Sequence, residues 1–216
     1  MDQSASAKPS LRGRVHQFSF FLAVVAGPFL IAGSHRAAAR FAAAVYVLSL
    51  VALLGISALY HRVNWSARAR QRMRRLDHAA IFVLIAGTYT PLAMTLPPEH
   101  SHRVLAFAWV CAGLGTLRAL FWISAPKGLV AGLALAMGWF VVGYLPSINA
   151  SAGPTVTLLV MAGGALYSLG ALAYAFRRPD PWPTVFGYHE IFHSFVVLAA
   201  ATHFAAVALA LDVIAA

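Results

Sequence analysis

The stretch that decides the fold is GYHEIFHSFVVLAAATHFAAVALAL, residues 187–211. It is long and apolar enough to cross the hydrocarbon core of a bilayer as a helix, which takes about 20 residues. Its first turns nevertheless carry His189, Glu190 and His193, which are costly in hydrocarbon unless they have partners or a function. A helix presents His189 and His193 on one face, where they can share a metal ion. The segment therefore predicts a transmembrane helix that contributes to a polar site.

The composition places the whole chain in a membrane. Of its 216 residues, 61% are hydrophobic and 10% are charged, which leaves too little polar surface for a soluble domain of this size. The net charge of +10 does not indicate nucleic-acid binding, because the basic residues lie in short links between apolar runs. We therefore expect a multi-pass integral membrane protein without a nucleic-acid partner.

Seven apolar runs each approach the length of a membrane span. They cover residues 15–33, 38–60, 76–96, 103–123, 127–145, 154–176 and 187–211. The first run resembles a signal peptide, but it is longer than the usual apolar core of such a peptide, so we expect it to be retained. The expected fold is all-α and integral to the membrane. It consists of one seven-helix transmembrane bundle over residues 15–216, after a disordered cytoplasmic tail over residues 1–14.

Lys and Arg are distributed unequally between the two ends of this expected bundle. Twelve of the sixteen belong to one end, namely Lys8, Arg12, Arg14, Arg62, Arg68, Arg70, Arg72, Arg74, Arg75, Lys127, Arg177 and Arg178. Only Arg36, Arg40 and Arg103 belong to the other end, and Arg118 lies within the fourth apolar run. Because cytoplasmic segments carry the excess of Lys and Arg, we expect the N-terminus inside and the C-terminus outside. The Arg-rich link over residues 62–75 is also an expected site for anionic lipid headgroups.

With this orientation, five polar residues share one membrane level at the cytoplasmic end. They are Ser57, His61, Asp77, His189 and His193. Three imidazoles leave the fourth position of a tetrahedral zinc ion open, which is the arrangement of catalytic zinc sites. A nearby carboxylate can then act as a general base, and a serine hydroxyl can orient a carbonyl. The sequence thus predicts a metal site with catalytic potential.

Residues 189–193 also match the pattern H-E-x-x-H of zinc metalloproteases, in which the Glu is the general base. In a membrane helix, this match suggests an intramembrane protease. The pattern fixes only three positions, and Glu190 is turned about 100° from His189 on a helix. A negative charge is also favourable at a helix N-terminus without any catalytic role.

Three segments carry a family resemblance. SALYH at residues 57–61, RLDHAAIFVLIAGTYTP at 75–91 and GYHEIFHSF at 187–195 resemble signature segments of the hemolysin III branch of the progestin and adipoQ receptor (PAQR) family. The resemblance extends over essentially the whole chain and implies seven spans with a cytoplasmic N-terminus.

The resemblance further implies a Zn²⁺ ion held by His61, His189 and His193. Asp77 is then placed to bind the zinc water, and Ser57 lies nearby. The wider superfamily includes alkaline ceramidases, and bacterial members of the family are linked to haemolysis and membrane-lipid homeostasis. We therefore expect membrane lipids as partners, with a ceramide-like amide or an ester as substrate, in the bacterial inner (cell) membrane.

Three functions stay open at this point. The first is a lipid hydrolase with Asp77 as base, the second is a lytic pore or membrane-state sensor with a structural zinc, and the third is a protease that uses Glu190. The family does not require an acid at the position of Glu190, which favours Asp77. We expect His78 to be a hydrogen-bonding partner near the site, His203 to lie too deep to be a ligand, and His16 to have no role.

Overall fold

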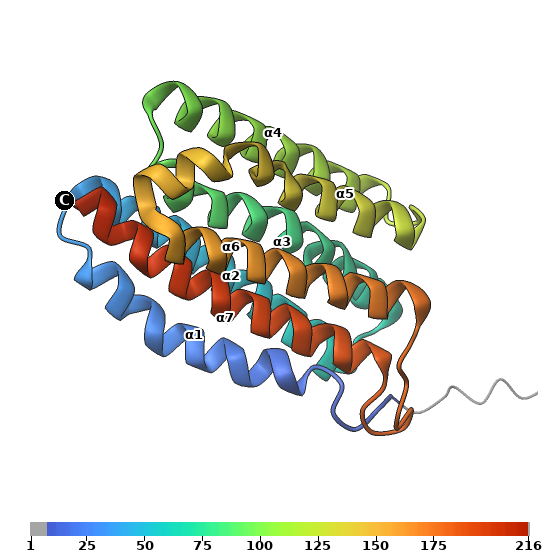
Figure 1. Ribbon diagram of the computed structural model, residues 1–216. Coiled ribbons are helices and arrows are strands. Elements are labelled where there is room, and N and C mark those ends of the chain that lie inside the picture. The colour runs from blue at the N-terminus through green and yellow to red at the C-terminus, as the bar shows by residue number, and fades with distance from the viewer. Residues whose placement is uncertain (1–7, 216) are drawn as a thin grey trace, which may run out of the picture.

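A computed structural model describes residues 8–215 as a bundle of helices (Figure 1). The helices are α1 (Arg14–Gly33), α2 (Ala37–Arg62), α3 (Ala67–Ala93), α4 (Pro98–Phe121), α5 (Lys127–Trp139), the 3₁₀ segment η1 (Phe140–Tyr144), α6 (Leu145–Phe176) and α7 (Tyr188–Ala215). The described residues form no β-strand, and they contain one isolated bridge, between Trp182 and Phe186. Six helical segments, counting residues 128–176 as one, are long and apolar enough to cross a membrane. The chain is a multi-pass integral membrane protein, as its composition indicates.

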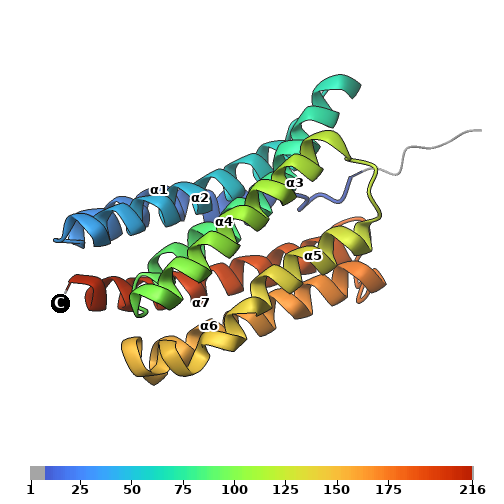
Figure 2. The same cartoon turned by 90° about the horizontal axis from the view of Figure 1, so that it is seen from above.

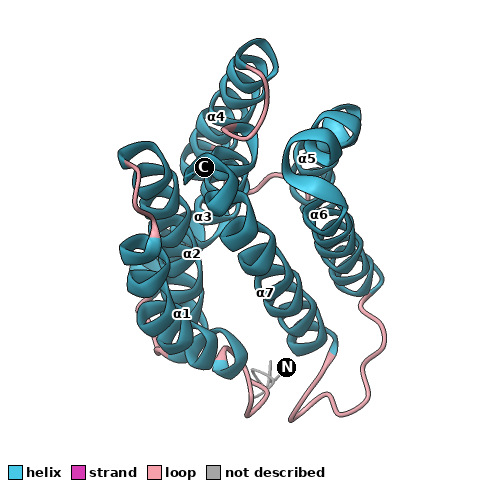
Figure 3. Ribbon diagram, turned by 60° about the vertical axis from the view of Figure 1, so that its left-hand side comes forward, coloured by secondary structure: helices cyan, strands magenta, loops and turns pink. Residues whose placement is uncertain are grey.

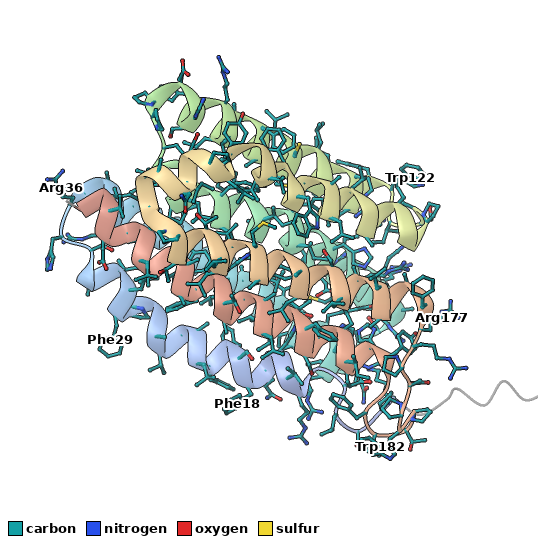
Figure 4. All side chains as sticks on the ribbon, in the orientation of Figure 1. Phe18, Phe29, Arg36, Trp122, Arg177 and Trp182 are labelled. Atoms are coloured by element: carbon teal, nitrogen blue, oxygen red, sulfur yellow. The ribbon has the colours of Figure 1, made fainter. Side chains whose placement is uncertain are left out.

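Apolar side chains cover the outside of the bundle. Phe18 and Phe29 of α1 are 67% and 74% exposed and project away from the other helices (Figure 4). Exposed apolar surface of this extent is typical of contact with lipid. Arg36 lies at one end of the bundle, and Arg177 and Trp182 lie at the other (Figure 4). The two arginines that the charge count assigned to different sides are therefore at opposite ends.

Helix α7 occupies the middle of the bundle. It contacts α1, α2, α3 and α6 (Figure 3). Helices α1 to α4 are neighbours in chain order, and α5 contacts α6 and, more sparsely, α3. Polar residues at the start of α7 can therefore meet side chains from several helices.

Glycines allow two pairs of helices to approach closely. Gly163 of α6 lies against the imidazole of His203 in α7, and Gly115 of α4 lies against the ring of Phe82 in α3. A Cβ atom at either glycine would overlap the facing ring. Close approach at small residues replaces the hydrophobic driving force that is missing between helices in lipid.

The segment between α5 and the long part of α6 differs from the sequence prediction. We expected residues 146–153 to be a link without helix, whereas the chain is helical until it reaches Gly153, whose φ is 85°. Glycine adopts this positive φ without steric cost, and Pro154 suits the first turn of the helix that follows. Helix α5 and the long part of α6 run side by side in opposite directions (Figures 1 and 2). The apolar run over residues 128–176 is therefore a helical hairpin.

Part of the expected disordered tail is ordered. The backbone N–H of Ser10 donates to the carbonyl of Thr184 at 3.0 Å, and the N–H of Leu11 donates to the carbonyl of Val185 at 3.2 Å. Residues 8–13 thus pair with the link between α6 and α7, and the expectation of disorder does not hold for them. Residues 1–7 of the expected tail lie outside the described residues.

Candidate metal centre

Three histidines converge where α2 ends and α7 begins. His61 lies in the last turn of α2, and His189 and His193 lie in the first two turns of α7. One ring nitrogen from each lies within 4.8 Å of those of the other two, and the Nε2 atoms of His61 and His189 are 3.4 Å apart. His193 is buried and the other two are half-buried. Three imidazole nitrogens are a common donor set for Zn²⁺, so the cluster predicted from the sequence can hold a metal ion.

A fourth histidine, to which the sequence assigned no role, lies against this cluster. His16, in the first turn of α1, is buried, and its ring stacks on that of His193 with centroids 4.0 Å apart and planes 21° apart. Neither nitrogen of His16 has a hydrogen-bond partner within residues 8–215. Depth along the spans could have identified His16 as well, because it lies at the start of the first span, at the end where the other histidines were expected.

Ser57 and Asp77 also lie together at this level. The hydroxyl of Ser57, one turn before His61 on α2, hydrogen-bonds to the carboxylate of Asp77 on α3. Ser57 is buried and Asp77 is half-buried. Both line the same cavity as the three clustered histidines. The structure thus brings together every residue that the sequence placed at this level.

Glu190 is held away from the cavity. Its buried carboxylate forms an ion pair with the guanidinium of Arg12 and accepts a hydrogen bond from the N–H of Gly187 at 2.9 Å. Among the described residues that line the cavity are both of its histidine neighbours in the motif, but not Glu190. The acid of the protease-like motif therefore anchors the N-terminal segment to α7.

The cavity connects the histidine cluster with the interior of the bundle. It has a volume of about 970 Å³. Its walls come mainly from α2, α3, α5, α6 and α7, and most of its lining is apolar. The volume falls within the range of pockets that bind small molecules. A polar cluster at one end of an apolar cavity is suited to an amphiphile, whose polar part would lie near the histidines.

The two remaining histidines within spans occupy different positions. His78 lines the cavity beside Asp77. His203 lies deeper, where a ring nitrogen is 3.1 Å from the carbonyl of Val160. His203 is therefore not part of the metal-ligand cluster, as its depth predicted.

The chain is similar in sequence to a known protein family and to several known proteins. The family described as haemolysin-III related matches residues 5–204. The chain is 30% identical to the hemolysin-3 homolog of Bacillus subtilis (strain 168) over 161 residues, which cover 74% of this chain and 72% of that protein.

More distant relatives come from eukaryotes. The chain is 30% identical to the heptahelical transmembrane protein ADIPOR2 of Oryza sativa subsp. japonica over 194 residues, covering 81% and 84% of the two chains. It is 27% identical to the monocyte to macrophage differentiation factor of Homo sapiens over 201 residues, covering 89% and 79%. The family match includes all the residues of the histidine cluster. The chain belongs to the haemolysin-III related family, the hemolysin III branch of the PAQR family to which its sequence motifs pointed.

Proposed function

We propose that this protein is a zinc-dependent hydrolase that cleaves an amide or ester bond of an acyl lipid in the bacterial cell membrane. The observation that carries the proposal is the convergence of three imidazoles, a carboxylate and a hydroxyl at one end of an apolar cavity. In this proposal, the transmembrane domain has seven spans, with the N-terminus in the cytoplasm and the C-terminus outside. The orientation follows from the excess of Lys and Arg at the end that holds the cluster.

His61, His189 and His193 would hold the ion. A zinc ion held there would act as a Lewis acid and would lower the pKa of bound water to about 7. His61 belongs to α2 and the other two histidines belong to α7, so one bound ion would fix the distance between these two helices.

Asp77 is the proposed general base. It accepts a proton from the attacking water while the water oxygen bonds to the acyl carbon. The proton then passes to the leaving nitrogen or oxygen as its bond to the acyl carbon breaks, so the products are a fatty acid and an amine or alcohol. Ser57, which hydrogen-bonds to this carboxylate, positions it.

A second candidate function is a non-enzymatic membrane protein in which the metal only stabilises the bundle. It is supported by the position of the cluster, since His61 belongs to α2 and the other two ligands belong to α7. The intramembrane protease has less support, because the carboxylate of Glu190 is engaged by Arg12 and by the N–H of Gly187. A general base must be within reach of the water that it deprotonates.

The test is fatty-acid release by the purified protein in mixed micelles, measured by mass spectrometry on a panel of ceramides, phospholipids and fatty-acid amides. Wild type should release fatty acid, and Asp77→Asn should lower the rate by about 10²-fold or more while it keeps its zinc. His102→Ala is the control, since His102 is exposed and does not line the cavity. Equal rates for Asp77→Asn and wild type would exclude the proposed base. Zinc retention without turnover on any lipid would favour the structural role.

A further inference from the structure

One stripe of α3 faces the cavity over almost the whole length of the helix. The lining residues recur every three or four positions, and they include Arg70, Arg74, Asp77, Ile81 and Leu84. This spacing keeps side chains on one face of a helix. The stripe changes character along its length: it begins with two arginines, passes the proposed base and continues with apolar side chains. The cavity wall therefore has a cationic end and an apolar end, with Asp77 between them.

Only some arginines of the Arg-rich segment belong to this stripe. Arg70 and Arg74 line the cavity, whereas Arg68, Arg72 and Arg75 do not. All five serve the positive-inside rule equally well, because that rule depends on the side of the membrane and not on the face of a helix. Arg70 and Arg74 therefore place positive charge at the cavity, and the orientation of the protein in the membrane does not require this placement.

Asp77 is the one acidic side chain among the described residues that line the cavity, and it forms no ion pair with these arginines. Within the described residues, neither Arg70 nor Arg74 forms an ion pair. The nearby Glu190 is already paired with Arg12. Lys8, which also lines the cavity, makes a 3.4 Å hydrogen bond to Asn64, a neutral partner. The mouth of the cavity thus has an excess of cations, which favours an anionic ligand.

The dimensions of the stripe define the shape of that ligand. Arg74 and Arg70 lie about 5 Å and 10 Å before Asp77 along the helix axis, at 1.5 Å per residue. In the other direction the lining extends to Leu92, about 22 Å beyond Asp77 by the same rise. A long acyl chain fits the second distance, and a small charged headgroup fits the first.

From this arrangement we propose that the cavity selects an acyl lipid with a compact anionic headgroup. The anionic group binds Arg70 and Arg74, the scissile bond lies at the level of Asp77, and the acyl chain lies along the apolar part of α3. This inference rests on the proposed hydrolase function for its scissile bond, but the binding preference stands without turnover. In an N-acyl amino acid, water adds OH to the acyl carbon and a proton to the nitrogen, which yields a fatty acid and a free amino acid. A carboxylate or a phosphate can supply the negative charge.

The first experiment measures binding without turnover. N-oleoylglycine, lysophosphatidic acid with an oleoyl chain, and neutral N-oleoylethanolamine are titrated into the Asp77→Asn protein in neutral detergent. We expect one or both anionic lipids to bind at least tenfold more tightly than the neutral one, because hydrogen bonds to a charged group are stronger than those to a neutral group. The stronger of the two anionic ligands identifies carboxylate or phosphate as the preferred group. Equal binding of all three lipids would overturn the proposal.

The second experiment compares two pairs of arginines on the same helix. Arg70→Gln with Arg74→Gln should weaken binding of the preferred anionic lipid about tenfold or more and leave binding of N-oleoylethanolamine unchanged. Arg68→Gln with Arg72→Gln removes the same charge from another face and should change neither. An equal loss in both double variants would show a diffuse effect of surface charge and would overturn the proposal.

Turnover separates this inference from the proposed function. In the otherwise wild-type protein, the Arg70 and Arg74 double variant should raise KM for the anionic lipid more than it lowers kcat. Hydrolysis that favours the neutral amide and is insensitive to both arginines would overturn the inference and leave the hydrolase function intact. If the protein binds the anionic lipid selectively but wild type hydrolyses no lipid, the hydrolase function is overturned and the binding preference is kept.

Discussion

The imidazole of His16 lies flat against that of His193, with ring centroids 4.0 Å apart. His16 belongs to α1 and His193 to α7, so the stack joins the first helix to the metal-ligand cluster. Both rings are 3% exposed. Because the two rings are in contact, the stack restricts rotation of the His193 ring, which is one of the three candidate metal ligands.

His16 is therefore expected to be a positioning residue for the metal site. His16→Ala should weaken zinc affinity about tenfold, the lower end of the effect of removing a group that supports a metal ligand. His16→Phe keeps an aromatic ring and should restore most of the affinity. The measurement is competition with a zinc-binding dye in detergent, and His35→Ala, at an exposed site, is the control. Unchanged affinity in His16→Ala would show that the stack does not position the ligand.

The ion pair between Arg12 and Glu190 is expected to stabilise the fold. Removing Arg12 leaves a buried carboxylate without its cation, which typically costs about 3–5 kcal/mol. Arg12→Ala should therefore lower the Tm of the detergent-solubilised protein far more than Arg14→Ala, which removes an exposed arginine two residues away. The double variant Arg12→Ala with Glu190→Gln should recover part of the loss. Similar Tm values for Arg12→Ala and Arg14→Ala would contradict this role.

Two adjacent glycines in α6 should respond differently to one added methyl group. A Cβ at Gly163 would overlap the His203 ring, whereas at Gly164 it would lie 3.6 Å from Trp139, an ordinary contact. Overpacking of this kind costs about 1–3 kcal/mol. Gly163→Ala should thus lower the Tm by several degrees, and Gly164→Ala should leave it nearly unchanged. The reverse order would show that α6 and α7 pack differently.

The orientation in the membrane can be tested with cysteine labelling. With Cys111→Ala as background, Arg36→Cys should react with a membrane-impermeant maleimide on intact cells, or on spheroplasts if an outer membrane is present. Arg177→Cys, at the other end of the bundle, should react only after lysis. If only Arg177→Cys reacts from outside the cell, the protein has the opposite orientation to the one proposed.

The helices and the histidine cluster could be predicted from the length of the apolar runs, the depth of the polar residues and their spacing. Hydrophobic runs identify spans because about 20 apolar residues match the bilayer, and four-residue spacing places His189 and His193 on one face. His61 was expected near these two histidines because successive spans alternate in direction, which places the end of its span and the start of the last span on the same side of the membrane. All of these features depend only on the position of a residue along a span.

Contacts that depend on tertiary packing could not be predicted in this way. The pair of Arg12 and Glu190 is separated by 178 residues, and no local pattern marks either as a partner of the other. The helical turns before Gly153 were also missed, since Pro, Ser, Asn and Gly ordinarily mark a link. Neighbouring helices can stabilise such a segment as helix even though its propensity is low.

His61, His189 and His193 should together bind one zinc ion. The most direct test is the zinc content per chain of the purified protein, measured by plasma mass spectrometry after dialysis against metal-free buffer. We expect about one zinc per chain in wild type, in His102→Ala and in Asp77→Asn, and almost none in His61→Ala or His193→Ala. Folding of the two ligand variants is checked by gel filtration in detergent. If folded His61→Ala and His193→Ala contain as much zinc as wild type, these histidines do not hold the ion.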